Sequence, residues 1–290
     1  MNNIIKKKPF DDLTITDNYM FQTVMRDPKN VKPLLEMIFG KKIKKITVIE
    51  REKTIETGYE SRGIRMDVYV EDDEKTVYDV EMQASRKPNL GKRFRYYQSA
   101  IDVDTVNKGE SYLKLKKSFI IFITTYDPFD KGWYVYPFET LCSWDGSIRM
   151  DDYAMKIVLN AKGSIDKEKH EVSDDIKEML SYMDGKAPKS EYSKMLDEAV
   201  KKVKQNHERR TEYMSINTFA MDEQLVGEYK KIVKSIRKND GIYPDNDILT
   251  ILDINPTVLF CVRKALSKHS DWDDEDIAEE VLAMPEMDDL

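Results

Sequence analysis

The chain is poor in cysteine and histidine. Its 290 residues include 2 cysteines and 3 histidines, and Cys142 and Cys261 lie far apart in the sequence. This scarcity argues against a disulfide framework and against a zinc site of the usual ligand types. It favours reduced thiols in a cytoplasmic protein. A bound metal would have to be held by carboxylates, which favours Mg²⁺ or Mn²⁺.

Long apolar runs, glycine and proline are scarce as well. The longest purely apolar run extends from Phe119 to Ile123, whereas a membrane-spanning helix needs about 20 apolar residues. We therefore expect no membrane association. The three lysines at positions 6–8 are not followed by the apolar stretch of a secretory signal. With 11 glycines, 10 prolines and a hydrophobic share of 40%, the chain is predicted to be globular and not dominated by loops.

Charge is distributed unevenly along the chain. The net charge is −7 overall, but residues 1–120 carry 24 Lys and Arg against 19 Asp and Glu. Residues 270–290 carry ten acidic residues and neither Lys nor Arg. A basic N-terminal region can bind a polyanion, while an acidic C-terminal region keeps the chain soluble.

The pattern of apolar residues divides the chain into two regions. Residues 10–165 mix helix and strand signals, and residues 173–290 are helical with an acidic tail. In the first region we expect a helix that is capped by Asp12 or Thr14, divided by Pro28 and Pro33, and ended by Gly40. A second helix is expected over 89–107, and strands are expected at 43–50, 53–59, 64–71, 76–84, 118–125, 133–138 and 154–159. A long helical pattern that starts near residue 190 suggests a coiled-coil arm or a helical hairpin.

Two acidic residues are predicted to meet on the hairpin of residues 64–71 and 76–84. If residues 73–75 form a three-residue turn, Asp67 lies directly opposite Glu81, with about 4.5–5.5 Å between their Cβ atoms. Gln83 follows two residues later on the same face. Like charges placed opposite each other destabilise a hairpin, and a divalent cation between them would reverse that effect. The alternative is a solvated polar face on which the acids stand by chance.

Five stretches, taken in order, resemble the PD-(D/E)XK nuclease superfamily, and in particular its Rpn family of recombination-promoting nucleases and putative transposases. Asp67 and the triplet Glu81-Met82-Gln83 are similar to the Asp…(Glu/Asp)-x-Lys pattern of that superfamily. The stretches lie at residues 16–21, 63–70, 78–83, 93–102 and 109–123.

The resemblance implies an α/β fold, namely a restriction-endonuclease-like α-β-β-β-α-β core with a mixed central sheet, followed by a mainly helical C-terminal region. It also implies Mg²⁺-dependent (or Mn²⁺-dependent) hydrolysis of phosphodiester bonds in DNA. Asp67 and Glu81 would be catalytic metal ligands, the backbone carbonyl of Met82 a third ligand, and Asp17 a further direct or water-mediated one.

One position of the motif departs from the superfamily pattern. Gln83 stands where many members have Lys, so it brings hydrogen-bonding capacity but no charge. Met66 also replaces the proline that often precedes the first aspartate. The first interpretation is a metal-dependent DNA endonuclease linked to recombination or mobile elements, with Gln83 in the catalytic set. The alternative is a non-catalytic DNA-binding or assembly protein on a degenerate nuclease fold.

Five basic residues and no acidic one lie between the hairpin and the middle of the next helix. They are Arg86, Lys87, Lys92, Arg93 and Arg95. Near a helix N-terminus that starts at Asn89 or Leu90, they favour contact with the DNA backbone without sequence readout. The alternative is a solvated basic helix end. The acidic helical region is expected to stay off DNA and to contact another copy of the chain or a regulatory partner.

Overall fold

The computed structural model describes residues 8–55, 64–86, 88–167, 170–239 and 241–287. Contacts divide the chain into a unit of residues 11–207 and a second unit of residues 208–290 with the first ten residues. The elements of the first unit are α1 (Asn18–Met25), α2 (Pro28–Phe39), β1 (Ile46–Ile55), β2 (Ile64–Asp72), β3 (Val77–Gln83), α3 (Leu90–Thr105), β4 (Ser118–Thr124), β5 (Val135–Phe138), β6 (Ala154–Asn160), α4 (Asp174–Met183) and α5 (Glu191–Gln205). Those of the second are α6 (His207–Asn239), α7 (Asp245–Leu252), α8 (Pro256–Lys268) and α9 (Asp274–Leu282).

The first unit is built on a six-stranded mixed sheet in the order β1-β2-β3-β4-β6-β5. β1, β2 and β3 pair antiparallel, β4 is parallel to both β3 and β6, and β5 is antiparallel to β6. The chain passes from β3 to β4 through α3, as a parallel connection requires. The expected α-β-β-β-α-β core is therefore confirmed.

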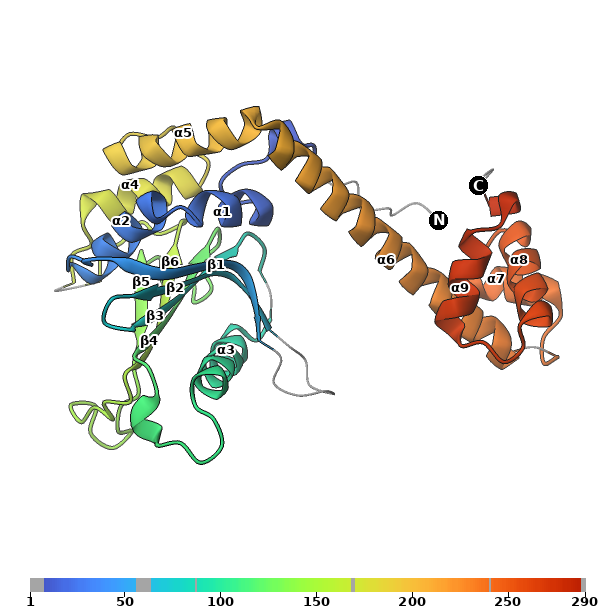
Figure 1. Ribbon diagram of the computed structural model, residues 1–290, viewed down its shortest axis with the longest axis horizontal. Helices are drawn as coiled ribbons and strands as arrows, with labels where there is room; N and C mark the ends of the chain where they lie inside the picture. Colours follow the sequence, from blue (N-terminus) through green and yellow to red (C-terminus); the bar gives the residue numbers. More distant parts are fainter. Residues whose placement is uncertain (1–7, 56–63, 87, 168–169, 240, 288–290) are drawn as a thin grey trace. The chain divides into compact units, whose positions relative to one another are not determined.

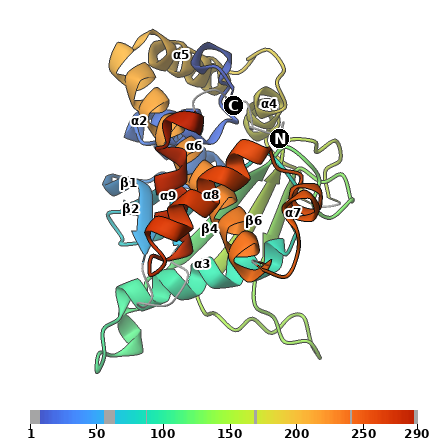
Figure 2. The ribbon, with the colours of Figure 1, turned by 90° about the vertical axis from the view of Figure 1, so that its right-hand side faces the viewer.

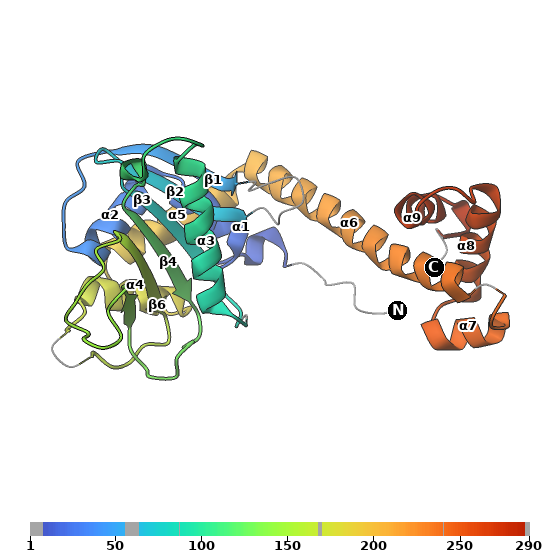
Figure 3. The ribbon, with the colours of Figure 1, turned by 90° about the horizontal axis from the view of Figure 1, so that it is seen from below.

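Helices cover both faces of this sheet. α1, α2, α4 and α5 lie on one face and α3 lies on the other (Figure 1). Figure 3 shows α3 running along the sheet, where Phe94 and Tyr97 pack with Phe122 of β4. All seven residues of β4 are buried, which confirms that the apolar run at residues 119–123 is an interior strand.

The turn between β2 and β3 fixes the register of the hairpin. The side chain of Asp72 accepts hydrogen bonds from the backbone N–H groups of Glu74 and Thr76, both at 2.9 Å. Lys75 takes a positive φ of 63°, so the turn closes without glycine. The pairs from Glu71–Val77 to Val68–Val80 follow the predicted register.

Two expectations for the first unit are wrong in detail. The sequence predicts two strands at residues 43–50 and 53–59, but β1 is a single strand from Ile46 to Ile55 that pairs with β2, with a register shift between Ile46 and Val48. Residues 56–59 lie outside the described part of the chain. Pro33 does not divide the first helical region, because it lies inside α2. Its neighbours Val31, Leu34 and Leu35 are fully buried, and their burial offsets the roughly 3 kcal/mol cost of an interior proline.

The boundary expected between residues 165 and 173 does not coincide with the division of contacts. α4 and α5 pack on α1 and α2 and belong to the sheet-containing unit. Tyr192 of α5 is buried and donates a hydrogen bond to the carbonyl of Asn30 at 2.7 Å. The long helical pattern is also interrupted, because α5 ends at Gln205 and α6 begins at His207.

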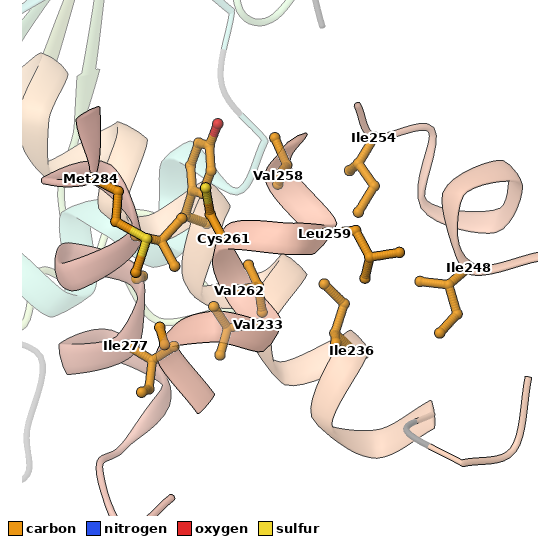
Figure 4. Packing of buried hydrophobic residues seen from close by; sticks show 14 residues of the cluster. Val233, Ile236, Ile248, Ile254, Val258, Leu259, Cys261, Val262, Ile277 and Met284 are labelled. Carbon is orange, nitrogen blue, oxygen red and sulfur yellow. The ribbon is translucent and has the colours of Figure 1, made fainter. Parts of the chain in front are cut away.

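The second unit has a hydrophobic core of its own. α8 and α9 lie side by side (Figure 2). Figure 4 shows Val233 and Ile236 of α6, Ile248 of α7, Val262 of α8 and Ile277 of α9 within one cluster. Among the described residues, no helix is long and apolar enough to cross a membrane.

The described part of the acidic C-terminal segment, residues 270–287, belongs to this folded unit. Four of its acids form ion pairs within the unit: Glu275 with Lys230, Asp274 with Arg237, Glu280 with Lys268 and Glu286 with Lys264.

We predict that Ile277→Ala lowers the free energy of unfolding of the second unit by about 2–5 kcal/mol, because it leaves a cavity in the core. Ile277 is fully buried, and Glu279 in the same helix is exposed. Thermal unfolding of the two variants tests this, with Glu279→Ala expected to lie within about 0.5 kcal/mol of the unmodified protein. Equal unfolding of Ile277→Ala and the unmodified chain would contradict the proposed packing of α9.

Candidate functional site

β2 and β3 part at one end of the hairpin. Their ladder ends at the pair Val68–Val80. Beyond it β2 continues beside β1, with Met66 opposite Lys53, and β3 continues beside β4, with Glu81 opposite Phe122. We call this divergence the fork.

Two carboxylates fill the fork. The backbone N–H of Asp67 donates to Oε1 of Glu81 at 2.7 Å, and the backbone N–H of Met82 donates to Oδ2 of Asp67 at 3.0 Å. Each side chain thus replaces a main-chain bond that the parting strands no longer make. The structure brings Asp67 and Glu81 together, as the hairpin register predicted.

Two further side chains hold these carboxylates from opposite faces of the sheet. Gln22 of α1 donates from Nε2 to Oδ1 of Asp67 at 2.8 Å. Tyr97 of α3 donates from its hydroxyl to Oε2 of Glu81 at 3.3 Å. Gln22 was not predicted from the sequence; it is a buried amide among mainly apolar residues of α1, and this position was the available signal.

Burial and mutual repulsion change the protonation of the acids. Burial, followed by the charge of Asp67, raises the pKa of Glu81 to about 8. Asp79, two residues before Glu81 on β3, is fully buried, and neither of its carboxyl oxygens has a hydrogen-bond partner among the described residues. Burial and the charges of Glu81 and Asp67 raise its pKa well above its usual range, which favours the neutral form of Asp79.

The oxygens of the fork suit a hard divalent cation. Val77 and Gln83 of β3 make backbone hydrogen bonds to residues that flank β4. Backbone groups of successive strand residues point to opposite sides, so the carbonyl of Met82 points away from β4 and toward the fork. Two carboxylates and one carbonyl match the few protein ligands that Mg²⁺ takes alongside water and phosphate oxygens. The described residues contain no cluster of three or more acidic, histidine or cysteine side chains that could hold a metal.

Asp17 is placed differently from Asp67 and Glu81. It is the residue before α1 rather than part of the helix, and its Oδ2 accepts hydrogen bonds from the N–H and the hydroxyl of Thr14 at 2.6 and 2.9 Å. Its neighbour Asn18 lines the cleft at the fork. Participation of Asp17 in a metal site remains a prediction.

A cleft of about 880 Å³ opens at the fork and is bordered by basic side chains. Lys92, Arg93 and Arg95 of α3 line it together with Arg65 of β2, which the sequence analysis did not single out. Arg65 lies two residues from Asp67, on the same side of the strand by alternation.

Arg86 stands apart from this lining. Nη2 of Arg86 donates to the carbonyl of Asp127 at 2.6 Å and lies 3.3 Å from the carboxylate of Asp130. These contacts direct the Arg86 side chain toward the loop that follows β4. Lys87 lies outside the described residues.

Gln83 holds an arginine beside the acids. Its Oε1 accepts a hydrogen bond from Nη1 of Arg93, and its Nε2 donates to the carbonyl of Met82 at 3.1 Å. Nη2 of Arg93 lies 3.8 Å from Oε2 of Glu81. The predicted residues Glu81, Gln83 and Arg93 are therefore in contact.

The comparison with known families agrees with this geometry. Residues 16–143 match the family of PD-(D/E)XK nuclease family transposases, and the first unit has the PD-(D/E)XK fold. The matched segment contains the fork and every residue named above as lining the cleft. No curated protein and no solved structure matches the chain significantly.

The raised pKa of Glu81 predicts a pH-dependent stability. The folded protein keeps the Glu81 proton up to about pH 8, whereas the unfolded chain releases it near pH 4.5. This group therefore stabilises the fold below about pH 4.5, and that contribution is lost as the pH rises to 8.

We expect Glu81→Gln, which cannot ionise, to raise the melting temperature at pH 8.5 in EDTA by more than about 2–4 °C, equivalent to about 1 kcal/mol or more, and to change it little at pH 4.5. Thermal unfolding at both pH values measures the difference. The same shift at both values would show that Glu81 is not a buried acid with a raised pKa.

Proposed function

We propose that this chain, with a PD-(D/E)XK nuclease family transposase domain over residues 16–143, is a metal-dependent DNA endonuclease of the Rpn type, linked to recombination or mobile elements. The observation that carries the proposal is the pairing of Asp67 with Glu81 at the fork, inside a cleft bordered by basic side chains. Carboxylate oxygens for a cation and cations for phosphates are the two requirements of phosphodiester hydrolysis.

Asp67 and Glu81 would hold Mg²⁺ or Mn²⁺, with the carbonyl of Met82 as a third protein ligand. Such an ion, when bound, polarises the phosphate and makes water a better nucleophile. Gln22 and the backbone N–H groups of Asp67 and Met82 orient the two carboxylates, and groups of this kind tune metal affinity.

The basic residues of the cleft would hold the DNA backbone. Lys92 and Arg95 are exposed on α3, and α3 directs its N-terminus toward the same cleft, which Asn89 lines. Free N–H groups at a helix N-terminus also favour phosphate. Contacts of these kinds to phosphate carry no sequence information, so we propose binding with little sequence preference.

The alternative function is DNA binding or assembly without cleavage. Gln83 is the observation that favours it, because the position carries no charge of its own. The two functions differ in one property, which is whether strand cleavage depends on Asp67 and Glu81.

We predict that Asp67→Asn and Glu81→Gln each lower Mg²⁺-dependent cleavage of plasmid DNA at least about 10³-fold, because each removes a charged metal ligand. Both variants should keep their affinity for DNA. Glu74→Gln, in the turn at the other end of the hairpin, is the matched control and should cleave normally. If all four proteins bind DNA and none cleaves it with Mg²⁺ or Mn²⁺, the non-catalytic alternative is correct.

We further predict that Lys92→Glu combined with Arg95→Glu weakens binding to all duplexes alike. Each lost phosphate contact should reduce the slope of log affinity against log salt concentration by about 0.9. Fluorescence anisotropy over a salt series measures both quantities. Lys108→Glu, in the exposed segment after α3, is the charge-matched control, and an equal loss in that variant would mean that the effect comes from net charge alone.

A further inference from the structure

Arg93 differs from the other cations of the cleft in being held rigidly. Its side chain is 24% exposed, whereas Lys92 and Arg95 belong to exposed residues of the same helix. The guanidinium lies 5.1 Å from the ring of Phe122 and 5.7 Å from the ring of Tyr97. These rings immobilise it without neutralising its charge.

Gln83 directs this guanidinium toward the acids. The Gln83 amide donates to the carbonyl of Met82, which turns its oxygen toward Nη1 of Arg93. Nη2 then lies 3.4 Å from the hydroxyl of Tyr97 and 3.8 Å from Glu81. The amide thus has both of its polar ends occupied, and its function in the structure is to orient an arginine.

We propose that Arg93 supplies a fixed positive charge to the phosphate undergoing hydrolysis and that Gln83 is its positioning residue. This inference rests on the proposed function. Phosphoryl transfer is accelerated by fixed cations placed where negative charge develops. Gln83 itself brings no charge, and Arg93 projects from α3 to the same side of the fork.

The distance to Glu81 is consistent with this role. At 3.8 Å, Nη2 of Arg93 is within ion-pair range of Oε2 but beyond the 2.7–2.9 Å of a charge-assisted hydrogen bond. The guanidinium therefore keeps donors for a phosphate oxygen, since Arg carries five N–H groups in all. A purely structural ion pair would instead use its donors on the carboxylate.

The test separates reaction rate from affinity. We expect Arg93→Gln to lower the single-turnover rate at saturating DNA about 10²–10³-fold, with a much smaller loss of DNA affinity. Lys92→Gln, one residue away, should show the opposite balance, with a loss mainly of affinity. A variant Arg93→Gln that loses only affinity, in the manner of Lys92→Gln, would overturn the proposal.

Relocating the charge tests the positioning by Gln83. In the Arg93→Gln background, Gln83→Lys places a cation on β3 beside the vacated guanidinium position, and we expect it to recover at least about tenfold in rate. The same substitution in the presence of Arg93 should give no gain, because two cations then compete for one place. Failure of Gln83→Lys to improve on Arg93→Gln in a stably folded protein would overturn the assignment.

A measurement without cleavage distinguishes failure of this inference from failure of the proposed function. Calorimetric titration of the DNA-free protein with Mg²⁺ at pH 9 should give about fivefold or tighter binding for Arg93→Gln, because a repelling charge is removed, and unaltered binding for Lys108→Gln. If the unmodified protein binds Mg²⁺ but does not cleave DNA, the proposed function fails. The titration still shows whether the charge of Arg93 lies close enough to the metal site to weaken Mg²⁺ binding. Equal Mg²⁺ affinity of Arg93→Gln and the unmodified protein would overturn the inference about Arg93, whereas no Mg²⁺ binding by either protein would overturn the proposed function and this inference with it.

Discussion

The site depends on one structural constraint, which is the exchange of main-chain hydrogen bonds for carboxylate bonds where β2 leaves β3. Asp67 and Glu81 each accept a backbone N–H of the opposite strand. These bonds keep the fork open and hold both acids in it. A buried N–H that loses its partner costs about 1–3 kcal/mol, so replacing either carboxylate with a side chain that cannot accept a hydrogen bond would destabilise the fold. The same two side chains therefore serve the hairpin and the proposed chemistry.

This arrangement has an electrostatic consequence. Burial and the mutual repulsion of these carboxyl groups raise the pKa of Glu81 to about 8 and the pKa of Asp79 well above its usual range. Arg93 offsets part of the remaining charge from the side of α3. A divalent cation would favour the ionised form of Glu81, so metal binding at the fork would be coupled to the release of a proton.

The sequence predicted the proximity of Asp67 and Glu81 but not the fork. Alternation along two strands and a three-residue turn gave the register that the pairs from Glu71–Val77 to Val68–Val80 confirm; the ladder ends there, and the two carboxylates meet through backbone N–H groups instead of as a directly opposed pair. Gln22 and Asp79 could not be assigned in the same way. Gln22 contacts Asp67 from another element, 45 residues earlier in the chain. The sequence around Asp79 is typical of a polar residue on a strand, and only the packing of the folded protein buries it. Tertiary packing, not local pattern, decides both.

The division of the chain was harder to predict for a similar reason. The helical signal after residue 173 indicates helices but not what they pack against, and α4 and α5 belong with the sheet. The acidic composition of the last residues likewise hid the buried face of α9, where Ile277, Ala278 and Val281 contribute to a core. The many charged residues on the exposed face of an amphipathic helix dominate its composition, so composition alone does not reveal the apolar face that is buried.

The central claim is that Asp67 and Glu81 form a single cation site. Anomalous diffraction from crystals of the protein soaked with Mn²⁺ tests it most directly. The account predicts one peak in the fork, within about 2.0–2.6 Å of a carboxylate oxygen from each of the two residues. A peak bound by only one of them, or a Mn²⁺ site elsewhere with the fork empty, would contradict it.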